Sequence, residues 1–128
     1  MEKDKKYLLR SIEIAKGSVV NGGGPFGAVI VKNGKIISEA SNRVVLNNDP
    51  TAHAEILAIR QASTQLQTFD LNDCTLYTSC EPCPMCLGAI YWSGIRKVVY
   101  SSDRTDAEKA GFNDKFIYKV AKNEGIQL

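Results

Sequence analysis

The sequence predicts an α/β protein with a mixed central sheet and helices on both of its faces. Two apolar runs flank Asn33-Gly34, and Asn-Gly between such runs is the strongest short signal of an antiparallel hairpin. The later apolar runs alternate with helical patterns, and strand–helix–strand units pair their strands in parallel. A sheet that contains both kinds of pairing is mixed.

Each expected element has a local signal. An amphipathic stripe predicts a helix over residues 5–20, and the glycine run that follows it is interpreted as a loop that lets the backbone approach a ligand. Asp49 followed by Pro50 predicts a helix start with Asp49 as its cap. The polar stretch 41–49 is expected to be a loop. Helices are expected at 5–20, 50–65, 83–93, 105–110 and 113–122, and strands at 26–31, 36–40, 74–78, 97–100 and 126–128.

Length, charge and cysteine usage restrict the classes of protein to which this chain can belong. A chain of 128 residues predicts one domain, residues 1–128, and a net charge of +2 argues against nucleic acid as a partner without ruling it out. No apolar run reaches the roughly 20 residues of a membrane helix, so no membrane partner is expected. Four cysteines in a chain in which no secretory signal is found predict a reducing compartment, with metal or thiol chemistry in place of disulfides.

Two motifs carry the chemistry. The first is Pro50-Thr51-Ala52-His53-Ala54-Glu55, which contains the only histidine of the chain, and the second is Pro82-Cys83-Pro84-Met85-Cys86. His-x-Glu followed by Pro-Cys-x-x-Cys is the signature of zinc-dependent base deaminases. The two motifs therefore predict a zinc ion bound by protein and a hydrolytic reaction on a base.

The expected ligands of the zinc ion are His53, Cys83 and Cys86. A catalytic zinc site uses three protein ligands and leaves one place for water, whereas a structural site has four. No fourth ligand is evident, because Cys74 and Cys80 are interpreted as core residues. Glu55, two residues after His53, is expected to be catalytic and to move protons between water, ring nitrogen and leaving ammonia.

Beyond these motifs the chain resembles the cytidine-deaminase-like superfamily, and most closely its bacterial guanine deaminase branch. The resemblance lies in residues 24–31, 49–55, 76–92 and 105–118. It implies a three-layer α/β/α fold, one Zn²⁺ per chain, deamination of guanine to xanthine, and a cytoplasmic homodimer. Members of the branch continue past the position of Leu128, so the family's C-terminal tail is expected to be absent from these residues.

The substrate contacts are the least determined part of the prediction. A carboxylate at Asp114 matches the two adjacent donors of guanine, N1–H and the amino group, although a solvated helix-start carboxylate explains it equally well. The remaining expected contacts follow from the resemblance, and each has a plainer explanation as turn, core or packing residue: Phe26, Asn42, Ala54 and Trp92. The alternatives are a guanine nucleoside or tRNA adenosine as substrate, and a structural zinc module or RNA-binding protein as class.

Overall fold

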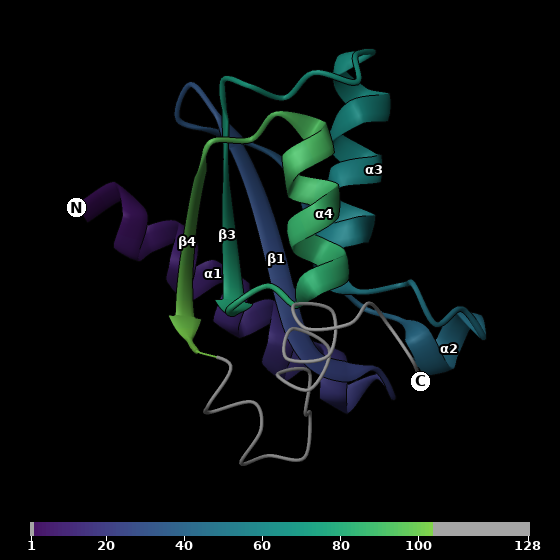
Figure 1. Ribbon diagram of the computed structural model, residues 1–128. Coiled ribbons are helices and arrows are strands. Elements are labelled where there is room, and N and C mark those ends of the chain that lie inside the picture. Colours follow the sequence, from purple (N-terminus) through teal and green to yellow (C-terminus); the bar gives the residue numbers. More distant parts are fainter. Residues whose placement is uncertain (1, 104–128) are drawn as a thin grey trace, which may run out of the picture.

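The computed structural model describes residues 2–103, which form a four-stranded sheet between two layers of helices (Figure 1). The elements are α1 (Glu2–Val20), β1 (Gly24–Lys32), β2 (Lys35–Asn42), α2 (Val44–Asn47), α3 (Ala54–Leu66), β3 (Cys74–Cys80), α4 (Pro84–Ser93) and β4 (Lys97–Ser102). The elements expected beyond residue 103, together with Asp114, lie outside the described residues.

The sheet is mixed, as predicted. Its strand order is β2-β1-β3-β4; β1 is antiparallel to both β2 and β3, whereas β3 and β4 are parallel. Asn33 and Gly34 form the predicted hairpin turn with φ values of 52° and 74°, the positive values that a type I′ turn requires. This topology puts the carboxyl ends of β2, β3 and β4 and the amino end of β1 at one end of the sheet.

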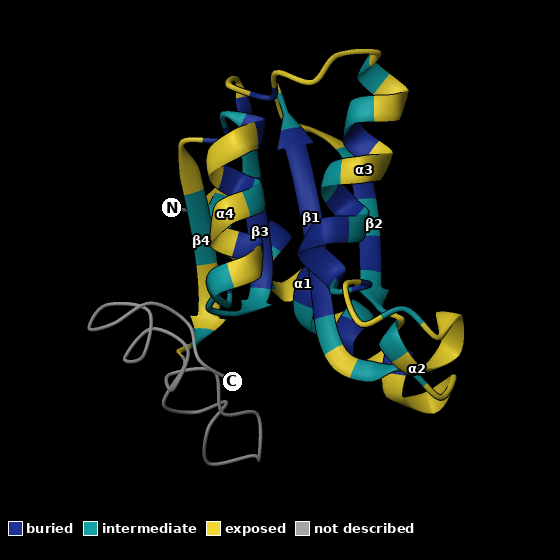
Figure 2. Ribbon diagram, turned by 45° about the vertical axis from the view of Figure 1, so that its right-hand side comes forward, coloured by how far each residue is buried: buried dark blue, intermediate teal, exposed yellow. Residues whose placement is uncertain are grey.

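Residues of β1 alternate between two hydrophobic clusters, one on each face of the sheet. Ala28 and Ile30 point toward α3 and α4, and Val29 and Val31 point toward α1. Such alternation follows from the two-residue repeat of a strand. The central part of β1 is buried on both faces of the sheet (Figure 2). This burial explains why its residues form a continuous apolar run in the sequence.

The expected loop at 41–49 and the expected helix start at Asp49 were both wrong. Residues Val44–Asn47 form the short helix α2, and α3 begins at Ala54 with His53 as its N-cap. The Asp49 carboxylate instead accepts hydrogen bonds from the Thr51 N–H at 2.9 Å and the Thr51 hydroxyl at 2.7 Å. Asp49 therefore closes an Asx turn, a use of aspartate that competes with helix capping.

The packing of α1 on β1 depends on the absence of a side chain at Gly27. A Cβ at Gly27 would overlap the Ser11 carbonyl oxygen and lie 2.8 Å from the Ala15 backbone nitrogen. We expect Gly27→Ala to lower the free energy of unfolding by about 3 kcal/mol, the upper part of the range for overpacked cores. Thermal melting of the purified variant measures this loss.

Gly17→Ala is the matched control, because a Cβ at Gly17 has nothing within 4 Å. Alanine replaces glycine inside α1 in this control, so its stability is expected to rise by up to about 1 kcal/mol. Equal melting temperatures for the two variants would contradict the close approach of α1 to β1.

Among the helices of residues 2–103, none combines the length and the apolar character that crossing a bilayer demands.

Candidate active site

The starts of two helices meet at the carboxyl end of β3 (Figure 1). His53 is the N-cap of α3, Cys83 is the N-cap of α4, and Cys86 lies in the first turn of α4. Pro84 occupies the first turn of α4, where its missing N–H costs no hydrogen bond. This confirms the predicted placement of the cysteines on α4.

The three side chains converge on one point. His53 Nδ1 lies 3.6 Å from Cys83 Sγ and 3.6 Å from Cys86 Sγ. The three donor atoms all lie within 4.8 Å of one another, and within residues 2–103 no other group of three or more His, Cys, Asp or Glu side chains converges in this way. The cluster brings together all three of the predicted metal ligands.

The geometry of the cluster fits zinc. Zinc binds cysteine sulfur at about 2.3 Å and histidine nitrogen at about 2.0–2.1 Å, so tetrahedral S and N ligands lie about 3.6 Å apart. The observed Nδ1–Sγ distances are both 3.6 Å. Three protein donors leave one position of a tetrahedron open, which is typical of catalytic and not of structural zinc sites.

The surroundings of Cys83 favour the thiolate, the form that binds metal. A hydrogen bond from the Cys86 thiol, together with the neighbouring His53, lowers the pKa of Cys83 to about 4. The pKa of Cys86 is raised by the same hydrogen bond and by burial. Both sulfurs lie at the N-terminus of α4, where the helix dipole stabilises negative charge.

Glu55 lies in the first turn of α3, two residues after His53, and its side chain is buried. Burial is the largest cause that raises the pKa of Glu55, and the nearby Cys83 raises it further. A carboxyl group whose pKa is moved toward neutrality is suited to accept and return a proton near neutral pH. Its position beside the metal cluster is the one that the His-x-Glu spacing predicts.

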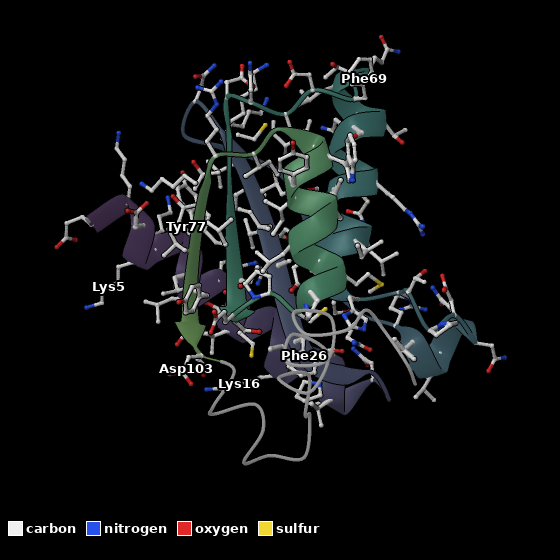
Figure 3. All side chains as sticks on the ribbon, in the orientation of Figure 1. Lys5, Lys16, Phe26, Phe69, Tyr77 and Asp103 are labelled. Atoms are coloured by element: carbon white, nitrogen blue, oxygen red, sulfur yellow. The ribbon has the colours of Figure 1, made fainter. Side chains whose placement is uncertain are left out.

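A β-bulge shapes the edge of the site next to Phe26. Gly24 pairs with Asn42 and Gly27 pairs with Ser41, so the register of β1 against β2 shifts between Gly24 and Gly27. Bulges of this kind re-aim side chains next to active sites. Phe26 is half-buried against the core cluster under α3 and α4, and it lies toward the N-terminal end of α4 (Figure 3). The contact with the core agrees with the core half of its expected role, whereas its role as a pocket wall stays a prediction.

Asn42 is the last residue of β2 and Ala54 is the first residue of α3. A backbone hydrogen bond links the two segments close to His53. The Arg43 N–H donates to the Ala52 carbonyl at 2.9 Å, which ties the end of β2 to the residue before His53. The Ala54 side chain is fully buried in the core. Only its backbone N–H, one of the N–H groups at a helix start that have no intrahelical acceptor, remains for a ligand.

Trp92 does not lie with these residues in the single chain. It is in the last turn of α4 and is 80% exposed, with its ring edge-on to Tyr91 at 5.3 Å. Nine residues of helix at about 1.5 Å each put it about 13 Å along the axis from Cys83. Trp92, one of the expected substrate contacts, therefore does not lie beside the His53, Cys83 and Cys86 cluster within one copy of residues 2–103.

Two hydrogen bonds that hold residues near the site in place were not predicted from the sequence. The Val44 N–H donates to Asn42 Oδ1 at 3.1 Å, and the Gly27 N–H donates to Ser79 Oγ at 3.0 Å. The first belongs to the unexpected helix α2. The second joins residues 52 positions apart, so no local pattern could have indicated it.

Comparison with known proteins agrees with this geometry. Residues 1–102 match the family described as the cytidine and deoxycytidylate deaminase zinc-binding region. The chain belongs to this family. It is therefore a zinc-dependent deaminase with the predicted α/β/α fold.

The similar proteins act on different bases. Guanine deaminase of Bacillus subtilis is 59% identical over 114 residues, which are 88% of this chain and 73% of that protein. A crystal structure of guanine deaminase from Bacillus subtilis matches with a TM-score of 0.89 and 51% identity over 97% of this chain and 83% of that one. The tRNA-specific adenosine deaminase of Aquifex aeolicus is 48% identical over 99 residues, which are 77% of this chain and 66% of that protein.

Proposed function

We propose that this protein deaminates guanine hydrolytically, with water as the second substrate and xanthine and ammonia as the products. The single observation that carries the proposal is the open His53, Cys83 and Cys86 cluster beside buried Glu55, in a chain 59% identical to a guanine deaminase. The alternative is tRNA adenosine, which the 48% identical tRNA deaminase favours.

In this proposal His53, Cys83 and Cys86 hold the zinc ion. Zinc supplies a Lewis acid that activates water for attack. Glu55 would accept one proton from the water and deliver it to the ring nitrogen beside the reacting carbon. It would then accept the second proton, from the hydroxyl now on that carbon, and deliver it to the amino group, which leaves as ammonia. The raised pKa of Glu55 supports both halves of this transfer.

The proposed recognition groups surround the base. Phe26 packs against the ring, while the Asn42 amide and the Ala54 N–H bind polar edge atoms. Asp114 accepts from N1–H and the amino group of guanine, a pattern that adenine lacks because its N1 carries no hydrogen. The proposal for Asp114 is supported by this complementarity and by the resemblance of segment 105–118 to guanine deaminases.

A panel of substrates tests the assignment. We expect ammonia release from guanine to exceed that from guanosine, adenine, cytosine and cytidine, and from a tRNA anticodon stem that bears adenosine. Asp114→Asn is expected to raise KM for guanine about tenfold, because the paired acceptor is lost. Asp106→Asn is the control, because it replaces a different carboxylate of the same segment. Turnover of the tRNA stem without turnover of guanine would refute guanine as the substrate.

We also propose a homodimer whose contact includes the outer face of α4. Leu87, Tyr91 and Trp92 are 41%, 75% and 80% exposed there, and the exposed side of α4 is visible in Figure 2. Aromatic side chains grouped on one surface are typical of protein interfaces. A cytoplasmic location accompanies the proposal, supported by four cysteines of which none forms a disulfide within residues 2–103.

Sedimentation velocity at micromolar concentration tests the dimer. Wild type is expected to sediment as a dimer, and Trp92→Glu is expected to shift it toward monomer because a buried charge would oppose association. Phe69→Glu is the control, since Phe69 is equally exposed at 86% but lies in the connection after α3. A monomeric wild type would remove the proposal.

A further inference from the structure

The chain passes from β3 to the proposed zinc ligand Cys83 through a very short connection (Figure 1). β3 ends at Cys80, and α4 begins at Pro84 with Cys83 as its N-cap. Only Glu81 and Pro82 lie between the strand and the ligand, and we call these two residues the β3–α4 connection. The position of the Cys83 sulfur therefore depends on the direction in which the chain leaves β3.

The β3–α4 connection is stiff, because prolines alternate with the residues that precede them. The rings of Pro82 and Pro84 fix φ at about −65°, and a residue before proline is restricted to extended conformations. This restriction applies to Glu81 and Cys83, and Cys83 is extended, with a φ of −72° and a ψ of 172°. A change of direction at the end of β3 is therefore transmitted to Cys83 and is not absorbed on the way.

Two hydrogen bonds determine the direction of the chain at the end of β3. The Glu81 N–H donates to the Ser102 carbonyl at the end of β4 at 2.6 Å. The Thr78 hydroxyl donates to the Cys80 carbonyl, which belongs to the last residue of β3. The first bond joins two backbone groups, whereas the second depends on the identity of one side chain.

Thr78 lies on the face of the sheet that α3 and α4 cover. It pairs with Ala28 of β1, and Ala28 belongs to the hydrophobic cluster under these two helices. Residues directly opposite one another in an antiparallel pair share a face. Thr78 is only 1% exposed, and a hydroxyl in such a place is costly unless it makes a hydrogen bond. Valine would fill the same space without that cost, so packing alone does not explain the hydroxyl.

We propose that Thr78 is a positioning residue of the metal site. By holding the Cys80 carbonyl, it directs the β3–α4 connection so that the Cys83 sulfur meets the other two ligands. Groups that orient metal ligands without touching the metal typically contribute 10–100-fold to metal affinity. The inference goes beyond the proposed function, because it concerns zinc affinity and holds for whichever base the protein deaminates.

Thr78→Val tests the proposal, because valine keeps the branched shape and removes the hydroxyl. The zinc affinity of the purified protein is measured by competition with a chromophoric chelator. The dissociation constant is expected to rise at least about tenfold, the lower end of the effect of such orienting groups. Thr78→Ser keeps the hydroxyl and is expected to bind zinc as the wild type does. A loss of affinity in Thr78→Ser as large as that in Thr78→Val would overturn the role of the hydroxyl.

Ser38→Ala is the matched control for the loss of a buried hydroxyl. Ser38 is 5% exposed in β2, and its hydroxyl donates to the Ala58 carbonyl of α3 at 2.8 Å. The control therefore removes the same kind of bond away from the β3–α4 connection. Both variants are expected to melt below the wild type, because each leaves a carbonyl without its hydroxyl donor. Only Thr78→Val is expected to lose zinc affinity, and an equal loss in Ser38→Ala would overturn the proposal.

Cobalt substitution adds a readout that a merely structural role of Thr78 would not change. The visible absorption of Co²⁺ depends on the number and geometry of its thiolate ligands, so a displaced Cys83 is expected to alter the spectrum of Thr78→Val. Wild-type zinc affinity with a wild-type cobalt spectrum would overturn the proposal, even if the variant melts at a lower temperature. If Thr78→Val does not fold, Thr78→Ala removes the same hydroxyl with a smaller side chain, and the same two measurements decide.

These measurements are independent of the substrate. If guanine is not turned over and the tRNA stem is, the guanine assignment is wrong, while the comparison of zinc affinities between Thr78→Val and Ser38→Ala still tests Thr78. If guanine is turned over and Thr78→Val binds zinc as the wild type does, only the positioning role is refuted.

Discussion

Replacing Glu55 with glutamine is expected to lower kcat for guanine by about 10²–10⁴-fold, the usual contribution of general acid–base catalysis. The amide has nearly the same shape as the carboxyl group but cannot carry a proton between water and base. Because Glu55 lies outside the His53, Cys83 and Cys86 cluster, zinc content is expected to stay at one per chain. Steady-state ammonia release and metal analysis on the same preparation measure both quantities.

Glu39→Gln is the control for this experiment. Glu39 is a carboxylate of β2 that pairs with Arg10 of α1 at 2.6 Å, so its replacement changes the same chemical group away from the metal cluster. We expect this control to keep wild-type kcat. If Glu55→Gln released ammonia at the wild-type rate, the proton transfer assigned to Glu55 would be wrong.

Removal of a metal-binding thiol is expected to have the largest effect on stability. In Cys86→Ala, zinc content should fall from one per chain to near zero. The melting temperature should fall by at least about 10 °C, because the binding free energy of zinc is partly folding free energy. The Cys86 side chain is fully buried, and the cluster joins the starts of α3 and α4. Differential scanning calorimetry with metal analysis measures the change.

Cys80→Ala separates loss of zinc from loss of any cysteine. Cys80 lies three residues before Cys83 at the end of β3 and is not in the metal cluster, so this variant is expected to keep its zinc. Wild-type protein treated with a chelator is expected to melt like Cys86→Ala. A zinc-free variant that melts like wild type would show that the metal does not stabilise the fold.

The metal cluster could be predicted because its signals are local in the chain. Cys83 and Cys86 are placed by a single helix start, and Pro84 identifies that start. His53 and Glu55 lie two residues apart at the start of another helix. The hairpin at Asn33-Gly34 was predictable for the same reason, since its positive φ values are a property of the residues that form the turn.

Contacts between distant residues decided the remaining features of the site. The Arg43–Ala52 hydrogen bond joins the end of β2 to the segment just before α3, and no local pattern indicates it. The Asp49 carboxylate binds Thr51, only two residues away, but the sequence does not reveal this choice either, because Asp serves turns and helix caps equally well. The orientation of Asn42 likewise depends on α2 and on the empty space at Gly24.

By itself, the sequence determined the fold class and indicated the grouping of His53, Cys83 and Cys86 near Glu55, because capping, turn chemistry and ligand spacing act over a few residues. Only the tertiary structure decided which apolar side chains face the core. Phe26 is half-buried beside the site, whereas Trp92 is 80% exposed at the far end of α4. The same hydrophobic character suits a pocket, a core or an interface, and only the neighbours that the folded sheet and helices supply distinguish these three environments.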